Sequence, residues 1–413
     1  MDTHRRTLRI AVIGAGIAGL TAAIAFRKEG HAVEVFESSA LNKEIGAALS
    51  LTSNALRALS YLGFNINNLR AGDYRGVMWF DSRGGEGKFA KMHDLRNSFD
   101  PPGILCHRSD LHDELKRLAG KDEGAGKPVT INLNCEVASC DPMAGTFTLK
   151  NGDVHHADLI IGADGIHSKI RTSVLGYQQT ALPSSRAAFR CLVDTAKLQG
   201  RAEFDWIRLG EPGPRGVTAQ DGSKRYLIIY PCRDDTLVNI VAHYPDLREQ
   251  DKFDWNALVT KEELVEKFKD FAPQFAGLLA LADAPVHLWQ IRALPCLPTW
   301  IRGRAALAGD AAHATFPTMG QGAGIAIEDA VALACLMPPG TAADEVPARL
   351  VAYQTLRKER GEFILTESVE QVTIPAKQGL YSRSQEMQEY IMGHDAVVEA
   401  QEYLAAHFSK LEN

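Results

Sequence analysis

The first forty residues contain the pattern that most restricts the fold. Residues Arg9–Ile13 ("RIAVI") form a short apolar run, Gly16–Lys28 have the pattern of a helix, and Ala32–Glu37 ("AVEVFE") form a second short run. The glycine-rich turn "GAGIAG" joins the first run to the helix. Strand, tight turn, helix and second strand together make a βαβ unit. The chain is therefore predicted to open an α/β domain of the Rossmann type.

The glycines of this turn have the spacing G-x-G-x-x-G. In that pattern the first glycine allows a tight turn, the second allows close approach of a pyrophosphate, and the third allows the helix to pack on the strand. The free N–H groups of the helix start then face the phosphates. The residues predicted to bind a cofactor at this turn are Gly14, Gly16, Ala18 and Gly19.

Glu37, 18 residues after Gly19, ends the second predicted strand. A carboxylate at that place can accept both hydroxyls of an adenosine ribose and would repel a 2′-phosphate. The alternative is a packing turn beside a surface glutamate. From these residues alone, FAD and NAD fit equally well.

Length and charge limit the class of protein. A chain of 413 residues is long enough for two domains, and its net charge of -6 argues against a nucleic-acid partner, which usually requires a basic surface. The apolar run after the basic N-terminus is broken by glycines, and no run approaches the roughly 18 apolar residues of a membrane span. The seven cysteines contain no C-x-x-C pair, so we expect buried free thiols, no metal site and a cytoplasmic location.

The middle of the chain has a different pattern. Four segments between Arg186 and Tyr244 have the composition of strands, "AAFRCLV", "FDWIRL", "RYLIIYP" and "LVNIVAHY", which predicts an antiparallel sheet. The polar stretch Gly210–Lys224 is interpreted as a long hairpin connection. The pattern of alternating strand and helix returns after Leu288, so the sheet is predicted to be inserted into a discontinuous domain.

The predicted division follows from these patterns. A cofactor domain comprises 1–70, 103–180 and 285–370, a β-sheet substrate domain comprises 71–102 and 181–284, and 371–413 is a helical C-terminal segment. That last segment is expected to be interrupted at Pro375 and to end in one amphipathic helix, "EMQEYIMGHDAVVEAQEYLAAHF".

A second glycine-rich element, "GDAAHATFPTMGQGAGIAIEDA", follows a predicted strand. An aspartate at the strand end can accept a hydrogen bond from a ribityl or ribose hydroxyl. The Gly-Gln-Gly-Ala-Gly run lets a helix start direct its N–H groups, with about half a positive charge, at an electron-rich ring edge. A simple turn would explain the glycines but not the preceding Gly-Asp. The residues predicted to bind a cofactor here are Gly309, Asp310, Gly322, Ala323 and Gly324.

Three motifs resemble the signature of the flavin-dependent aromatic hydroxylases, the single-component FAD monooxygenases typified by p-hydroxybenzoate hydroxylase. In chain order they are "GAGIAG", "DGIHSKIR" and "GDAAHATFPTMGQGAGIAIEDA". The resemblance covers the chain from Leu8 to about Arg360. Two further stretches, "EIGAALSLTSNALRAL" and "CHRSDLHDEL", are most similar to the salicylate hydroxylase branch.

The resemblance implies specific roles around a bound FAD. Asp164 and Gly165 match the family's Asp-Gly motif, in which the aspartate organises the pyrophosphate region and helps a nicotinamide cofactor to dock. Arg108 matches an arginine that reaches the FAD phosphate and ribityl region, and the backbone at Ala48 is expected to pass the flavin edge. From its position alone, Asp164 could equally cap the following helix.

Other polar residues in these motifs are expected to be structural. The resemblance implies that His313 packs and hydrogen-bonds under its loop, and His167 is treated in the same way. The acidic pair Glu328 and Asp329 is expected to support the first turns of its own helix.

The reaction that the resemblance implies is aromatic hydroxylation. NADH or NADPH binds transiently and reduces FAD, O2 then gives a flavin C4a-hydroperoxide, and one oxygen atom passes to an electron-rich ring. A phenol reacts best as its phenolate, so the site needs a group that stabilises this anion. Arg190, as a permanent cation, and Tyr230, as a hydrogen-bond donor, are the candidate catalytic residues. An outward-facing arginine and a sheet-packing tyrosine are the alternatives.

One departure bears on the substrate. Where some bacterial relatives place a histidine base a few residues before the tyrosine, this chain has Tyr226. A larger phenol, polyketide or indole, and with it oxidative dearomatisation or epoxidation, therefore competes with salicylate-type hydroxylation. An FAD oxidase or dehydrogenase and a non-catalytic flavin-binding module are the other classes considered. We expect a monomer or homodimer with no membrane or nucleic-acid partner.

Overall fold

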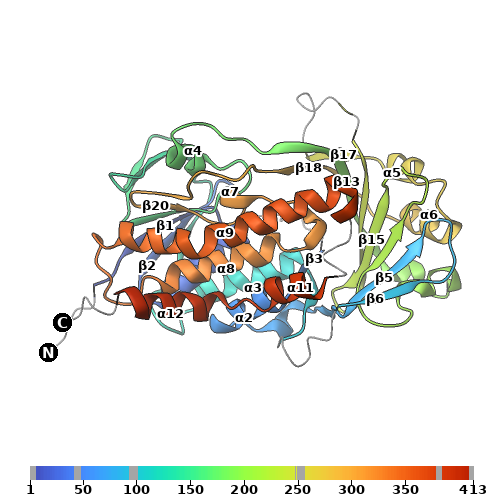
Figure 1. Ribbon diagram of the computed structural model, residues 1–413, viewed down its shortest axis with the longest axis horizontal. Coiled ribbons are helices and arrows are strands. Elements are labelled where there is room, and N and C mark those ends of the chain that lie inside the picture. The colour runs from blue at the N-terminus through green and yellow to red at the C-terminus, as the bar shows by residue number, and fades with distance from the viewer. Residues whose placement is uncertain are drawn as a thin grey trace.

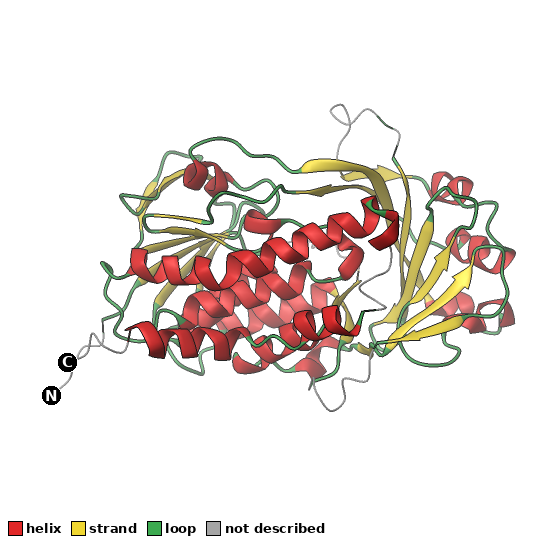
Figure 2. Cartoon of the chain, in the orientation of Figure 1, coloured by secondary structure: helices red, strands yellow, loops and turns green. Residues whose placement is uncertain are grey.

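The structure is a computed structural model, and it describes residues 6–40, 48–92, 101–246, 248, 256–377 and 384–408. Figure 1 shows an elongated molecule in which a sheet covered by long helices occupies one end and a large antiparallel sheet occupies the other. Helix α9 (Val346–Thr373) runs along the molecule from the first part to the second. Figure 2 shows the same arrangement, with most of the long helices in the first part.

The first part is organised on a six-stranded sheet. The strand order is β19 (Ile301–Arg302), β20 (Ala305–Leu307), β12 (Leu159–Gly162), β1 (Arg9–Ile13), β2 (Ala32–Phe36) and β8 (Thr130–Asn132). The strands from β20 to β8 are parallel to one another, and the edge strand β19 pairs antiparallel with β20. The βαβ opening predicted from the sequence is thus β1, α1 (Ile17–Lys28) and β2, and it lies at the centre of this sheet.

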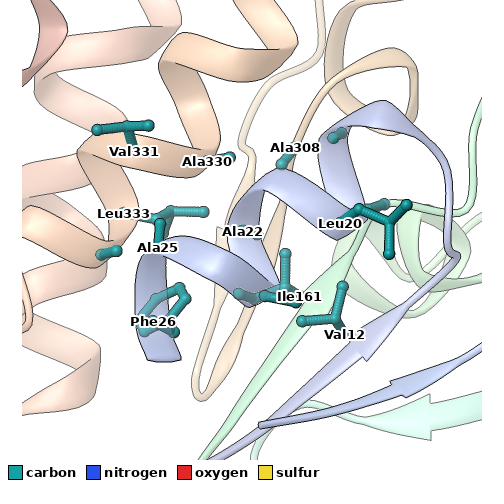
Figure 3. Close-up of a cluster of buried hydrophobic side chains, with 14 of the residues drawn as sticks. Val12, Leu20, Ala22, Ala25, Phe26, Ile161, Ala308, Ala330, Val331 and Leu333 are labelled. Carbon is teal, nitrogen blue, oxygen red and sulfur yellow. The ribbon is translucent and has the colours of Figure 1, made fainter. Parts of the chain in front are cut away.

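Helices cover one face of this sheet. Helix α1 packs against α3 (Arg108–Gly120) and α8 (Gly322–Cys335), and eleven of its twelve residues are buried. Figure 3 shows Ala22 and Ala25 of α1 beside Ala330 and Val331 of α8, over Val12 and Ile161 of the sheet. Small side chains let two helices approach closely, which explains the alanine-rich sequence of both helices.

The second face carries a small antiparallel sheet and a short helix. The strands are β9 (Val137–Asp141), β10 (Thr146–Leu149) and β11 (Val154–His156), and the helix is α4 (Lys169–Leu175). Phe147 of β10 packs edge-on against Phe36 of β2, with ring centroids 4.8 Å apart.

The second part is an eight-stranded sheet, in the region where the sequence predicted an antiparallel sheet. The strand order is β17 (Asn256–Val259), β18 (Val286–Ala293), β13 (Leu182–Asp194), β16 (Leu237–Pro245), β15 (Tyr226–Cys232), β14 (Arg215–Thr218), β5 (Gly76–Asp81) and β6 (Lys88–Lys91). Neighbouring strands are antiparallel, except that β14 and β5 are parallel.

The two faces of this sheet have different environments. Alternate residues of the central strands, such as Phe189 and Ile240, form a separate core with α5 (Lys261–Lys267) and α6 (Pro273–Ala280). The residues between them face the first part of the molecule. A three-stranded sheet, β3 (Ala48–Leu51), β7 (Ile104–His107) and β4 (Gly72–Asp73), lies between the two parts, and β7 contacts β15.

The remaining elements are helical. They are α2 (Ser53–Tyr61), α7 (Asp310–His313), α11 (Gln385–Met392) and α12 (Ala396–Phe408), with 3-10 turns at Ile66–Leu69, Thr195–Leu198, Ala202–Ile207, Pro317–Met319 and Pro375–Lys377. In the described part of the chain, no helix combines the length and apolarity that a membrane crossing requires.

Two local predictions in the inserted sheet were wrong. The segment "FDWIRL" is not a strand, because Ala202–Ile207 form a 3-10 helix that buries Phe204 and Ile207, three residues apart, on one side. Within Gly210–Lys224, predicted as a connection, Arg215–Thr218 form β14. Gly216 makes this strand possible, since a Cβ there would lie 2.2 Å from the ring of Trp79 on β5.

Two boundaries also differ from the prediction. The inserted sheet was predicted to end at residue 284, but β18 is hydrogen-bonded into it between β13 and β17. The expected single C-terminal helix is divided, with α11 ending at Met392 and α12 beginning at Ala396. The division has a physical cause, because the intervening His394 turns inward to contact Arg357, and Asp395 caps α12.

Candidate active site

The first glycine-rich turn connects β1 to α1. Gly14 has a φ of +102°, and a Cβ on it would lie 2.4 Å from the carbonyl oxygen of Ala163. Gly19 touches the carbonyl of Gly14 so closely that a Cβ would lie 1.9 Å from that oxygen. Gly16, in contrast, has open space where its Cβ would be, and it lines a cavity together with Ala18. This arrangement fits a phosphate group approaching the backbone at Gly16.

Glu37 follows β2 and supports this turn. Its carboxylate accepts a hydrogen bond from the backbone N–H of Ala15 at 2.8 Å and another from Ser39 at 2.7 Å. Burial would raise the pKa of Glu37, but these N–H donors hold it below its ordinary value. The side chain is therefore a carboxylate beside the turn, and its predicted contact with a ribose stays a prediction.

Asp164 lies in the turn after β12. Its carboxylate accepts hydrogen bonds from the side chain of Ser168 at 2.6 Å and from the backbone N–H of Lys169 at 2.7 Å. Burial raises the pKa of Asp164, although these donors oppose the rise. Asp164 thus accepts hydrogen bonds from the first N–H groups of α4, although the N-cap residue of that helix is Ser168. The buried Arg171 fixes the same turn by donating to the carbonyl oxygens of Ile166 and Ala311. The roles of Asp164 toward FAD and nicotinamide stay predictions.

The second glycine-rich element begins at Gly309, after β20. Asp310 opens onto the cavity, and the surrounding protein raises the pKa of its carboxyl group, although His313, Arg108 and Arg171 oppose the rise. The start of α8 also faces the cavity, through Gly322 and Ala323.

The histidine and the two acidic residues of this element are buried. His313 shares a hydrogen bond with Asp329, with Nε2 and Oδ2 2.6 Å apart, which agrees with the structural role expected for it. Asp329 also accepts the backbone N–H of Gly309. The expectation that Glu328 and Asp329 support the first turns of their helix was wrong. Both pair with the buried Arg357 of α9, because the helix turns these side chains toward α9 rather than toward its own N-terminus.

All these elements surround one cavity of about 980 Å³ between the two parts of the molecule. Nine of the fifteen residues predicted to bind a cofactor or to act in catalysis line it: Gly16, Ala18, Ala48, Arg108, Arg190, Tyr230, Asp310, Gly322 and Ala323. The other six are not among the lining residues: Gly14, Gly19, Glu37, Asp164, Gly309 and Gly324. Gly165 and Tyr226, also noted in the sequence, line it as well. Residues 44–47 of the stretch "EIGAALSLTSNALRAL" lie outside the described residues.

The eight-stranded sheet forms the opposite wall of this cavity. Arg190 of β13 lies 5.7 Å from the ring centroid of Trp289, and its buried Nε has no hydrogen-bond partner among the described residues. Burial lowers the pKa of Arg190 from its usual value. Tyr230 of β15 is buried, and burial raises the pKa of its hydroxyl, although the positive charge of Arg190 opposes the rise. Because a raised pKa keeps the phenol protonated, Tyr230 can donate a hydrogen bond.

Two residues of β16, of which His243 lines the cavity, were not predicted. Asn239 accepts the backbone N–H of Ala48 at 3.0 Å and so ties this sheet to β3. His243 lies opposite Tyr226 in the β15–β16 register, and the two rings stack with centroids 4.2 Å apart at 16°. A signal was present in "LVNIVAHY", where the alternate residues Asn239, Val241 and His243 share one face of the strand.

The cysteines do not form a site. All seven are free, and Cys106, Cys191, Cys232 and Cys335 are buried. The expectation of burial was wrong for Cys296, which is exposed, and for the half-buried Cys135 and Cys140. Within the ranges that the structure describes, no three His, Cys, Asp or Glu side chains gather as metal ligands would.

Comparisons with known proteins identify the class. Residues 7–368 match the family described as "FAD binding domain". The hispidin-3-hydroxylase of Neonothopanus nambi is 42% identical over 413 residues, which is 98% of both chains. A salicylate hydroxylase of Pseudomonas putida is 32% identical over 378 residues, which is 87% of this chain and 83% of that protein.

Solved structures agree with these matches. A salicylate hydroxylase substrate complex has a TM-score of 0.75 at 25% identity and covers 96% of this chain and 98% of that one. The structure of CtdE with FAD and its substrate has a TM-score of 0.80 at 21% identity and covers 98% of both chains. The chain therefore belongs to the flavin-dependent aromatic hydroxylases, which confirms the resemblance seen in the motifs. It is an FAD-dependent monooxygenase.

Proposed function

We propose that the substrate is a phenolic compound larger than salicylate, and that it binds between the flavin and the eight-stranded sheet. The observation that carries this proposal is the extent of the cavity. It runs from Gly16 and Gly322 to Arg190 and Tyr230, and onward to Thr218 at the end of β14 and Lys224 shortly before β15. A single salicylate ring would leave much of this space empty beside a bound FAD.

The proposed catalytic residues are Arg190 and Tyr230. A guanidinium group in the wall of a protein cavity stabilises a phenolate more strongly than it would in water, because the surrounding dielectric constant is lower. The protonated hydroxyl of Tyr230 would donate a hydrogen bond to the substrate. Both residues come from neighbouring parts of one sheet, whose second core, with Phe189 and Ile240, holds them in place.

The chemistry divides between the cofactor and the chain. FAD, when bound and reduced by NAD(P)H, activates O2 and supplies one oxygen atom to the substrate, so that substrate-H, O2, NAD(P)H and a proton give substrate-OH, water and NAD(P)+. The residues proposed to hold it are Gly16 at the phosphates, with Asp310, Arg108 and the start of α8 around the rest of the group. The chain's own contribution is to bind the phenol, stabilise its anion and, once cofactor and substrate fill the cavity, exclude water from it.

The test is to measure NADH and NADPH oxidation by the FAD-loaded protein with hispidin, salicylate, simple phenols and indoles. Peroxide and oxygenated product are quantified together. We expect one large phenol to accelerate NAD(P)H oxidation and to yield product with little peroxide. Salicylate as the best substrate would contradict the proposal. The structure of the product separates ring hydroxylation from oxidative dearomatisation or epoxidation.

We also propose that the protein acts in the cytoplasm as a monomer or homodimer. The free thiols support a reducing compartment, where disulfides are rare. Light scattering after gel filtration tests the assembly, and a trimer or larger species would contradict it.

A further inference from the structure

His243 is a cavity residue whose place follows from the alternation of β16. Ile240, Ala242 and Tyr244 face the second core, so His243 faces the opposite side, toward the cavity. The residue is only 4% exposed, yet it contributes to the lining. A polar ring held in this way at a ligand cavity needs a hydrogen-bond partner.

Among the described residues, Nδ1 of this ring has no such partner. The buried Nδ1 of His243 makes no hydrogen bond to any residue that the structure describes, and the contact with Tyr226 is a ring stack. Burial, followed by the positive charges of Arg190 and Arg186, lowers the pKa of His243 to about 3. The imidazole is therefore neutral at neutral pH, and one of its two nitrogens is a hydrogen-bond acceptor.

His243 differs from two other histidines in its position. His287 on β18 lies 3.2 Å from the side-chain oxygen of Asn256, and His313 bonds to Asp329 through Nε2 at 2.6 Å, although its own Nδ1 has no partner among the described residues. Neither lines the cavity. Because His243 does line it, we expect this ring to take its partner from the cavity contents.

The register of the sheet places Arg190 next to this ring. Ala188 pairs with His243 across β13 and β16, and Arg190 pairs with Val241, so Arg190 and His243 are diagonal neighbours on the cavity face. Such neighbours are within reach of long side chains. A neutral acceptor and a permanent cation are thus side by side, and a phenolic O–H complements both, because its hydrogen can be donated while its oxygen accepts.

From this arrangement we propose that His243 contacts the substrate, accepts the hydrogen bond of a phenolic hydroxyl, and with Arg190 fixes the position of that oxygen. The proposal rests on the proposed function, since it assigns the recognition of the phenol within the same cavity. Tyr226 is a positioning residue in this account, because its ring holds the imidazole from one side.

The test uses two probes that differ only in the hydroxyl hydrogen, 4-nitrophenol and its methyl ether 4-nitroanisole. Each is titrated into FAD-loaded protein at a pH where the free phenol is protonated, and binding is followed by the flavin absorbance. The variants are His243→Phe, which keeps a flat ring without an acceptor, His243→Gln, which restores an acceptor, and the matched control His287→Gln.

We expect the wild type to bind 4-nitrophenol at least tenfold more tightly than 4-nitroanisole. His243→Phe should remove this preference, whereas His243→Gln should retain most of it and His287→Gln all of it. A preference that survives in His243→Phe with full FAD content overturns the proposal, as does a wild type without any preference. If His243→Phe does not fold, the preference for 4-nitrophenol over 4-nitroanisole is still tested with the wild type and His243→Gln.

The outcome is separable from that of the proposed function. If His243→Phe loses the preference while salicylate proves the best substrate of the wild type, the large-substrate proposal fails and the contact stands. If a large phenol is oxygenated with equal KM by His243→Phe and wild type, the large-substrate proposal stands and the contact fails.

Discussion

Replacing Glu328 by glutamine should destabilise the protein strongly, because this carboxylate compensates two buried cations. Glu328 is fully buried and accepts hydrogen bonds from Arg357 at 2.7 Å and from Arg360 at 2.7 and 2.9 Å. Burial would raise the pKa of Glu328, but the two arginines hold it well below its ordinary value. Glutamine preserves the volume, so the effect measured is that of the charge.

The expected loss of unfolding free energy depends on the hydrogen bonds that Arg357 and Arg360 keep. Removing one partner of a buried ion pair costs about 3–5 kcal/mol. Arg357 keeps its bond to Asp329, and Arg360 keeps the carbonyl oxygens of Tyr390 and Ile391, which places the expected loss near the lower end, at about 3 kcal/mol.

The assay is urea unfolding of the FAD-loaded protein, followed by circular dichroism. The control is Glu266→Gln, which removes a similar pair with Lys269 at the surface, where both side chains are about two-thirds exposed and no measurable change is expected. A Glu328→Gln midpoint equal to that of the control would refute the reasoning.

Three further predictions concern the cofactor turn, the sheet and the C-terminal segment. Gly16→Val should lower the FAD content of the purified protein at least tenfold without changing its circular dichroism, because the new side chain meets no protein atom within 4 Å at its Cβ. Arg190→Met should keep FAD but form product about 100-fold more slowly and release peroxide instead of product. A rate loss of this size is typical when a reacting anion loses one hydrogen-bond donor. Burial lowers the pKa of His394 to about 3; Glu328 opposes this change, and Arg360, Arg357 and Arg57 add to it. Because an unfolded histidine has a pKa of about 6.5, the unfolded chain binds one more proton than the folded chain between about pH 6.5 and 3. Stability should thus fall as pH falls through that window, and less steeply in His394→Asn; equal slopes would contradict this assignment.

The parts of the fold that sequence could predict are those set by local pattern. The strand, turn and helix from Arg9 to Lys28 have their bounds in the residues themselves, since the apolar periods and the glycine spacing are local signals. The same holds for the inserted sheet, whose strands β13, β15 and β16 each alternate between core and cavity residues.

Contacts set by tertiary pairing could not be predicted in this way. His243 meets Tyr226 only because of the β15–β16 register, and Glu328 meets Arg357 only because α8 packs on α9. The 3-10 helix at Ala202–Ile207 has strand-like composition but buries residues three apart. In each case a long-range contact, absent from any short window of sequence, decided the outcome.

The central claim, that this chain transfers oxygen from O2 to a phenol at the expense of NAD(P)H, is tested most directly by isotope labelling. The FAD-loaded protein is turned over with NADPH or NADH and its best phenol under 18O2, and the product is examined by mass spectrometry. We expect one 18O atom in each product molecule. A product that carries oxygen only from water, or a flavin that the phenol reduces without any nicotinamide, would contradict the account and indicate an oxidase or dehydrogenase instead.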